Sequence, residues 1–178
     1  MKRALAGIIF SFGLWALAGL GGCASDPPQR QSFEDCLYGA PEPIFDASLP
    51  GVSQHRFELQ PGKGVERFVL NQSTIVQIEQ TGCDQIRQEF TFSWDAAGRR
   101  EDWAAQAIQK YRELGELGAP YLSFSAISEV LQARKEKLRP RGEAISLQPG
   151  LAFRITAAET GQQSKLVTVL YETAPEEE

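Results

Sequence analysis

The amino-acid sequence predicts an α+β domain: an antiparallel β-sheet with a two-helix insertion packed on one face. Alternating apolar and polar residues fill the first part of residues 33–173. The apolar period then lengthens to that of a helix between about 103 and 138, and alternation returns afterwards. Strands on both sides of a helical pair are typical of a sheet with one face in water and one under helices. A barrel with the helices as an insertion is the alternative.

Four strands are expected before the helices. Residues 52–59 and 65–70 flank Pro61-Gly62-Lys63-Gly64, a turn sequence that predicts a hairpin with a four-residue loop. Residues 74–79 and 86–93 alternate apolar with polar side chains, which predicts a second pair of strands with one wet face. Before these strands, prolines between 41 and 50 predict an irregular, ordered loop.

The first helix is expected from about residue 103 to 114. Its apolar side chains fall on one stripe, formed by Trp103, Ala107, Ile108, Tyr111 and Leu114. Gly118 and Pro120 then prevent the helix from continuing.

The second helix is expected from about Ser125 to Leu138. Ser125 or Ser123 is the expected N-cap, because a serine hydroxyl can accept from the free backbone N–H groups of the first turn. Pro140 follows its end. The apolar side of this helix comprises Ile127, Val130, Leu131 and Leu138.

Three further strands are expected after the helices. They are residues 144–148, 151–158 and 165–173, and Thr160-Gly161-Gln162 predicts a hairpin between the last two. Residues 174–178 form an acidic tail beyond the domain. Together, residues 33–173 are expected to fold as a single domain.

Residues 1–22 have the order of a secretory signal. Lys2 and Arg3 are followed by an apolar stretch from 4 to 20 and by small residues before Cys23. An uncleaved membrane-spanning helix is the alternative, since the stretch approaches the roughly 20 residues that a bilayer requires. Glycines at 19, 21 and 22 weaken the end of such a helix, which favours a cleaved leader.

The segment Leu20-Gly21-Gly22-Cys23 resembles the lipobox of bacterial lipoproteins. The resemblance covers residues 1–23 only. It implies that the Cys23 sulfur receives diacylglycerol, that the chain is cut before Cys23, and that the new amine is acylated with a fatty acid such as palmitate. Two or three acyl chains, at about 0.8 kcal/mol per buried CH2, anchor a protein stably.

The residues after Cys23 bear on location. In the enterobacterial lipoproteins that Cys23 resembles, an aspartate in the next position favours retention in the inner membrane, and this chain has Ala24. An outer-membrane protein facing the periplasm is therefore expected, with the inner membrane or the cell surface as alternatives. The polar residues up to 32 form the expected tether.

Cys36 and Cys83 remain once Cys23 is assigned to the lipid. An even pair in an oxidising compartment predicts a disulfide, which for a loop of this length contributes about 4 kcal/mol in the chain-entropy model. A reactive thiol or a metal ligand is the alternative. Neither cysteine has a histidine or a third thiol near it in sequence, so a zinc site would be incomplete.

No set of catalytic residues can be assigned from the sequence. His55 is the single histidine, and a structural or solvent-facing role is favoured over that of a catalytic base. Glu34-Asp35 and Glu101-Asp102 are adjacent carboxylates, whose side chains diverge on either a strand or a helix. We therefore expect no catalytic residue, no metal site and no cofactor.

Two surface clusters remain. A basic run near the end of the second helix predicts either contact with anionic lipid headgroups or a solvated helix end; it comprises Arg134, Lys135, Lys137, Arg139 and Arg141. An aromatic group predicts either a ligand groove or, preferably, core against the sheet; it comprises Trp94, Trp103, Tyr111, Tyr121 and Phe124.

The net charge of −5 gives no reason to expect a nucleic-acid partner. The sequence favours an envelope lipoprotein, membrane-anchored through Cys23, whose domain is a non-enzymatic binding or assembly module for an unidentified envelope protein. One alternative is a periplasmic inhibitor or immunity-type protein that inserts loop 41–50 or 61–64 into a cell-wall-degrading enzyme. An envelope hydrolase and a carrier of small ligands or lipids are further alternatives. A carrier predicts an apolar cavity between sheet and helices.

Overall fold

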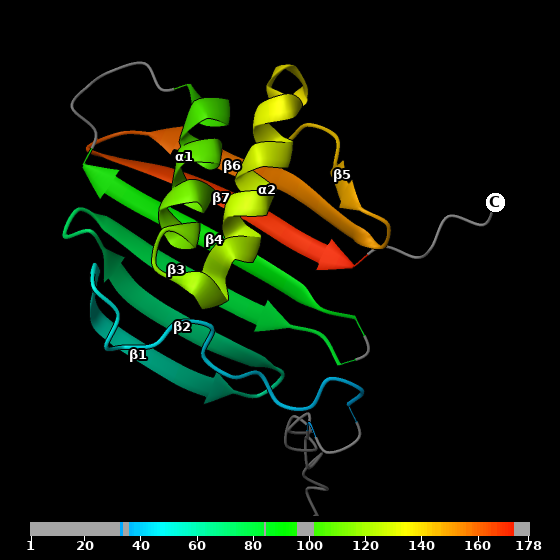
Figure 1. The fold of residues 1–178 in the computed structure, drawn as a ribbon. Coiled ribbons are helices and arrows are strands. Elements are labelled where there is room, and N and C mark those ends of the chain that lie inside the picture. The colour runs from blue at the N-terminus through cyan, green and yellow to red at the C-terminus, as the bar shows by residue number, and fades with distance from the viewer. Residues whose placement is uncertain (1–32, 34–35, 84, 96–101, 173–178) are drawn as a thin grey trace, which may run out of the picture.

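A computed structural model describes residues 33, 36–83, 85–95 and 102–172. The expected leader, Cys23, the tether and the acidic tail lie outside these residues. The described chain forms one antiparallel sheet with two helices across one face, as Figure 1 shows. The predicted α+β class is confirmed. The barrel alternative is wrong, because β1 and β5 are separate edges of an open sheet and do not pair with each other.

The sheet has seven strands in the order β1-β2-β3-β4-β7-β6-β5. Consecutive strands form hairpins within β1–β4 and within β5–β7, and the pairing of β4 with β7 joins the halves that precede and follow the helices. The strands are β1 (Val52–Gln60), β2 (Lys63–Leu70), β3 (Thr74–Thr81), β4 (Arg87–Asp95), β5 (Ile145–Gln148), β6 (Leu151–Thr160) and β7 (Gln163–Glu172).

The turn between β1 and β2 is shorter than predicted. Gln60 pairs with Lys63, so only Pro61 and Gly62 form the loop. Gly62 has a φ of 76°, a left-handed conformation that glycine adopts without a Cβ penalty. Gly64 belongs to β2, where a Cβ would lie 2.7 Å from the Pro41 Cβ. The second glycine therefore allows the chain before β1 to pass close to the sheet.

The first helix, α1, spans Trp103–Gly115, as predicted. The second, α2, spans Leu122–Ala133 and differs from the prediction at both ends. Neither Ser123 nor Ser125 caps it, because a 3-10 helix over Ala119–Tyr121 leads directly into it, with Pro120 in the first turn. After Ala133 the chain forms a second 3-10 turn, Lys135–Lys137, instead of continuing to Leu138.

Aromatic side chains fill the space between the helices and the sheet. Tyr111 of α1 is fully buried, and its ring contacts those of Phe90, Phe124 and Phe153. Its hydroxyl lies 2.9 Å from Thr168 Oγ1, and burial holds the pKa of the phenol far above its ordinary value. Trp94 and Trp103 pack against the edge of this cluster. These side chains occupy the position where a carrier would hold its ligand.

Candidate functional site

A buried carboxylate, Glu66, lies on the helix-covered face of the sheet. It occupies the same alternate positions of β2 as Phe68 and Leu70, and its exposed fraction is 0%. Its cross-strand neighbours are Phe57 and Ile78. A carboxylate in such surroundings requires hydrogen-bond partners, because an unpaired charge in an apolar interior is strongly unfavourable.

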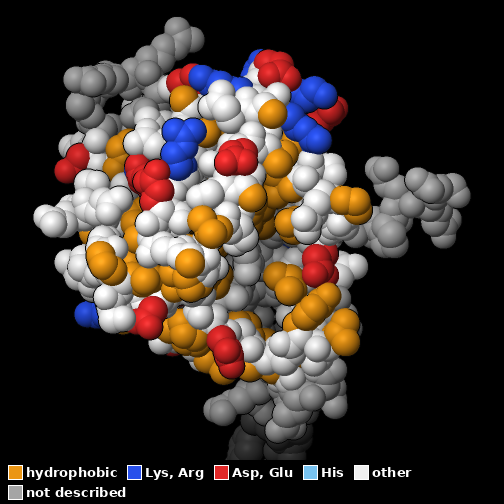
Figure 2. All heavy atoms as spheres, in the orientation of Figure 1, with side chains coloured by type: hydrophobic (Ala, Val, Ile, Leu, Met, Phe, Trp, Pro, Cys, Tyr) orange, Lys and Arg blue, Asp and Glu red, His pale blue; other side chains and the backbone are white. Residues whose placement is uncertain are grey.

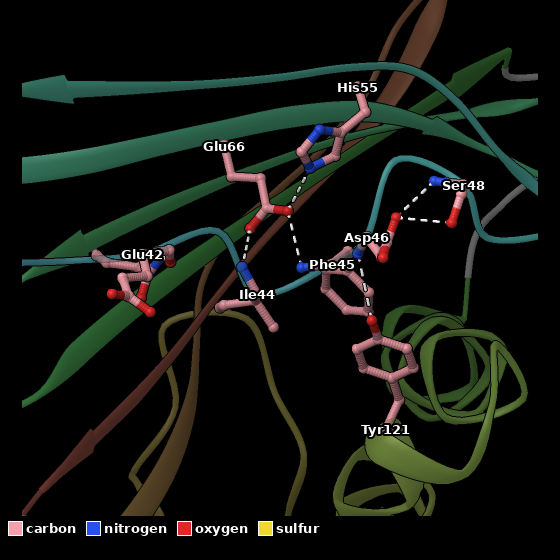
Figure 3. Close-up of polar contacts among 9 residues, drawn as sticks. Glu42, Ile44, Phe45, Asp46, Ser48, His55, Glu66 and Tyr121 are labelled. Atoms are coloured by element: carbon pink, nitrogen blue, oxygen red, sulfur yellow. Dashed lines mark hydrogen bonds and ion pairs between the residues drawn. The ribbon is translucent and has the colours of Figure 1, made fainter.

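Three donors surround the Glu66 carboxylate (Figure 3). The backbone N–H of Ile44 donates to Oε2 at 2.8 Å, and that of Phe45 donates to Oε1 at 2.9 Å. His55 Nε2 lies 2.7 Å from the same Oε1. We call this arrangement the Glu66 clamp. It fastens the irregular segment before β1 to a side chain of β2, so it replaces the sheet pairing that this segment lacks.

An irregularity in β1 brings His55 to the clamp. The register with β2 shifts between Ser53 and Arg56, and Gln54 has a φ of 54°. Such a bulge re-aims a side chain that regular alternation would place elsewhere. The imidazole is 11% exposed and stacks over Phe68 at a centroid distance of 6.2 Å. The structure thus gives His55 a structural partner.

Phe45 inserts into the core beside the clamp. It is 2% exposed, and its ring lies 5.0 Å from that of Phe68, 4.9 Å from that of Tyr121 and 5.5 Å from that of Phe124. The next backbone N–H, that of Asp46, donates to the Tyr121 hydroxyl at 3.2 Å. Segment 41–50 is therefore held against both the sheet and the helices.

The clamp does not present an activated nucleophile. The nearby Ser48 hydroxyl donates to Asp46 Oδ1 at 2.8 Å, so its proton is directed to that carboxylate and not to His55 (Figure 3). The hydrogen bonds from Ser48 hold the pKa of Asp46 below its ordinary value. The contacts of the Glu66 clamp join segment 41–50 to β2. Among the described residues, no group of three or more histidine, cysteine, aspartate or glutamate side chains could hold a metal ion.

Cys36 and Cys83 meet at one end of the sheet. Their sulfur atoms are 2.04 Å apart, which is disulfide distance, across a sequence separation of 47 residues. The predicted pairing is confirmed in that the two sulfur atoms lie at bonding distance. Tyr38 supports the same junction: its N–H donates to the Cys83 carbonyl at 3.4 Å, and its hydroxyl lies 3.1 Å from Glu172 Oε1. An open depression of about 650 Å³ lies beside it, lined by residues 81–83, 85–87, 171 and 172.

The basic run lies beside β5 and β6: the N–H of Arg141 donates to the carbonyl of Ile155 in β6. Asp102, whose carboxylate is 2.8 Å from Lys135 Nζ, directly precedes Trp103, and Trp103 contacts Trp94 near the end of β4. The Arg134 guanidinium donates to the carbonyl of Ser146. Figure 2 shows Lys and Arg side chains interleaved with acidic ones at the top of the view, where α2 ends in Figure 1. Contact of the run with an anionic surface stays a prediction.

Replacing Asp102 with alanine should lower the free energy of unfolding by about 1 kcal/mol, because its Oδ1 caps α1 by accepting from the Ala105 N–H at 3.1 Å. The hydrogen bond from Lys135 holds the pKa of Asp102 below its ordinary value. The contribution is therefore present at neutral pH and is lost as the pH falls below about 4. Urea unfolding at pH 7 and pH 3 should show a smaller difference between variant and parent at pH 3. An equal difference at both pH values would contradict this.

The two loops proposed for insertion into an enzyme are both short or fastened in the structure. Loop 41–50 is fastened by the clamp and loop 61–64 is reduced to a two-residue turn, so neither projects as a long free loop. Glu34, Asp35 and Glu101 lie outside the described residues. Within the described ranges, no helix is long and apolar enough to span a bilayer.

Comparison with family models, with curated proteins and with solved structures gave no match.

Proposed function

We propose that this chain is an envelope lipoprotein, anchored through lipid on Cys23, and that its domain acts as a non-enzymatic binding or assembly module. The observation that carries the proposal is the order of the first 23 residues: positive charge, an apolar stretch, and Leu20-Gly21-Gly22-Cys23. The contacts among the described residues have a structural explanation that requires no active site.

Three features of the domain support this proposal. The cysteines that remain after Cys23 lie at disulfide distance, which suits an oxidising compartment outside the cytoplasm. The interior is filled by aromatic side chains around Tyr111. The single histidine is committed to Glu66, a structural contact. The outer membrane is the proposed location, because Ala24 and not aspartate follows Cys23. The proposed partner is an envelope protein that the module docks.

Metabolic labelling with a fatty-acid analogue tests the anchor. The full-length chain should incorporate the label and fractionate with membranes, whereas Cys23→Ser should lose the label entirely and accumulate as the uncut precursor. A Cys36→Ser/Cys83→Ser variant is the matched control, because it removes two thiols and leaves the lipobox intact, so it should keep the label. Equal labelling of Cys23→Ser and the parent chain would overturn the proposal.

The assembly role needs a separate measurement. Cross-linking in intact cells, followed by purification of the lipidated chain and mass spectrometry, should recover a defined envelope protein. The same protein should be lost when the chain is expressed with Cys23→Ser. Recovery of only abundant, unrelated envelope proteins from both chains would count against a docking module.

A further inference from the structure

Exposed apolar side chains gather at the end of the sheet that holds the cysteine pair. Among the described residues, five large hydrophobic side chains are exposed, and four of them lie at this end. They are Leu37 (74% exposed), Tyr38 (50%), Leu59 (50%) and Ile86 (37%), and we call them the apolar rim. Figure 2 shows hydrophobic surface at the lower right, where the ends of these strands lie in Figure 1.

The strand register places the rim residues together. Gln60 pairs with Lys63, and the row continues across the sheet through Thr81, Arg87 and Tyr171. Leu59 and Ile86 each lie one residue from this row. Tyr38 joins it through Glu172, whose carboxylate also accepts from the Ile86 N–H at 3.4 Å. The rim is thus assembled from three separated parts of the chain.

The position of the anchor indicates what covers the rim. Twelve residues, 24–35, separate Cys23 from Cys36, and Cys36 is joined to Cys83 at this same end. A flexible chain of that length has a root-mean-square extension of about 20 Å. The nine residues of β4 span about 27 Å to the other end of the sheet. A short tether also maintains a high effective concentration of the rim at the bilayer, so a weak contact is sufficient.

We propose that the apolar rim rests on the lipid surface to which Cys23 is anchored, so that the domain stands with the cysteine pair toward the membrane. This proposal rests on the lipid anchor proposed above. Its contact is apolar and not electrostatic. Nearby cations are already paired, Lys63 with Glu79 at 2.7 Å and Arg87 with Glu89 at 3.1 Å. Tyrosine suits such a position, since its ring partitions to the level of the headgroups.

Fluorescence quenching by brominated lipid tests the orientation. The lipidated protein, cut before Cys23 and carrying Tyr38→Trp, is reconstituted into phosphatidylcholine vesicles, with and without bromine on the acyl chains. The added indole should lose fluorescence in the brominated vesicles and emit at shorter wavelength than in detergent-free buffer. Native Trp94 and Trp103, at the far end of β4, should show no loss in the parent protein.

Leu122→Trp is the matched control. Leu122 is 61% exposed but begins α2, and the neighbouring Leu117 packs near Gly51 at the opposite end of β1 from the rim. Its indole should not be quenched. Adding Leu37→Ser and Ile86→Ser to Tyr38→Trp should abolish the quenching, because these changes remove two apolar side chains of the rim. Both side chains are at the surface, so their loss leaves the core intact.

The outcomes separate this inference from the function on which it rests. If the protein is lipidated and floats with the vesicles but the Tyr38→Trp indole is quenched no more than that of Leu122→Trp, the orientation is wrong and the anchor stands. Quenching of Trp94 and Trp103 in the parent would also overturn the orientation. A chain that carries no lipid would overturn both. Adding anionic lipid or 1 M salt should leave the quenching unchanged; a strong dependence would contradict an apolar contact.

Discussion

Replacing Glu66 with alanine is expected to lower the free energy of unfolding by about 3–5 kcal/mol. The carboxylate is fully buried and accepts from the backbone N–H groups of Ile44 and Phe45 while pairing with His55. Its removal leaves these donors without an acceptor and opens a cavity beside Phe68. Urea unfolding followed by circular dichroism measures the loss as a fall in the midpoint.

The matched control is Glu89→Ala. Glu89 is a partly exposed carboxylate on the uncovered face of β4, paired with Arg87 at 3.1 Å, and its removal should change stability by no more than about 0.5 kcal/mol. Hydrogen exchange gives a local measure: the amides of Ile44 and Phe45 should lose protection in Glu66→Ala and keep it in Glu89→Ala. A Glu66→Ala protein no less stable than the control would show that the clamp does not fasten the segment.

The two halves of the clamp differ in how far the sequence predicts them. Strand 65–70 is predicted correctly in outline, and its alternation places Glu66 on the same face as Phe68 and Leu70, so a buried acid is detectable as a polar residue at a core position. The position of His55 is not predictable in this way. A bulge at Gln54 shifts the register of β1, and a single sequence contains no signal for it.

The errors in the helical region have a similar cause. Ser123 and Ser125 are good N-cap residues by type, but tertiary packing of Tyr121 and Phe124 against Phe45 begins the helical segment earlier. Ser125 instead lies where α1 and α2 approach each other, within 2.5 Å of the Cβ that Gly115 lacks. The apolar period identified the two helices, and packing determined where the second one begins.

The cysteine pairing was predictable for a different reason. Once Cys23 is assigned to lipid, only one pairing remains, so the number of cysteines is enough to predict it. What the count does not give is the consequence for the surface. The pairing draws Leu37 and Tyr38 to the ends of β3, β4 and β7, and this juxtaposition forms the apolar rim.

Removing the Cys36–Cys83 pair is expected to lower the free energy of unfolding by about 4 kcal/mol, because the separation of 47 residues is no longer closed in the unfolded chain. The Cys36→Ser/Cys83→Ser variant should therefore show a lower urea midpoint than the oxidised parent, with both compared in the Cys23→Ser background. The parent measured after reduction should match the variant. No difference between the oxidised and reduced parent would contradict a stabilising bond.

Combining this change with Glu66→Ala tests whether both contacts hold the same segment. The cysteine pair fixes residue 36 and the clamp fixes residues 44 and 45, so both restrain the chain before β1. Once one restraint is lost, the segment can detach locally while the sheet remains folded, and the second loss then has a smaller effect. The combined loss of stability should be less than the sum of the two single losses. Strict additivity would mean that the two contacts stabilise the domain independently.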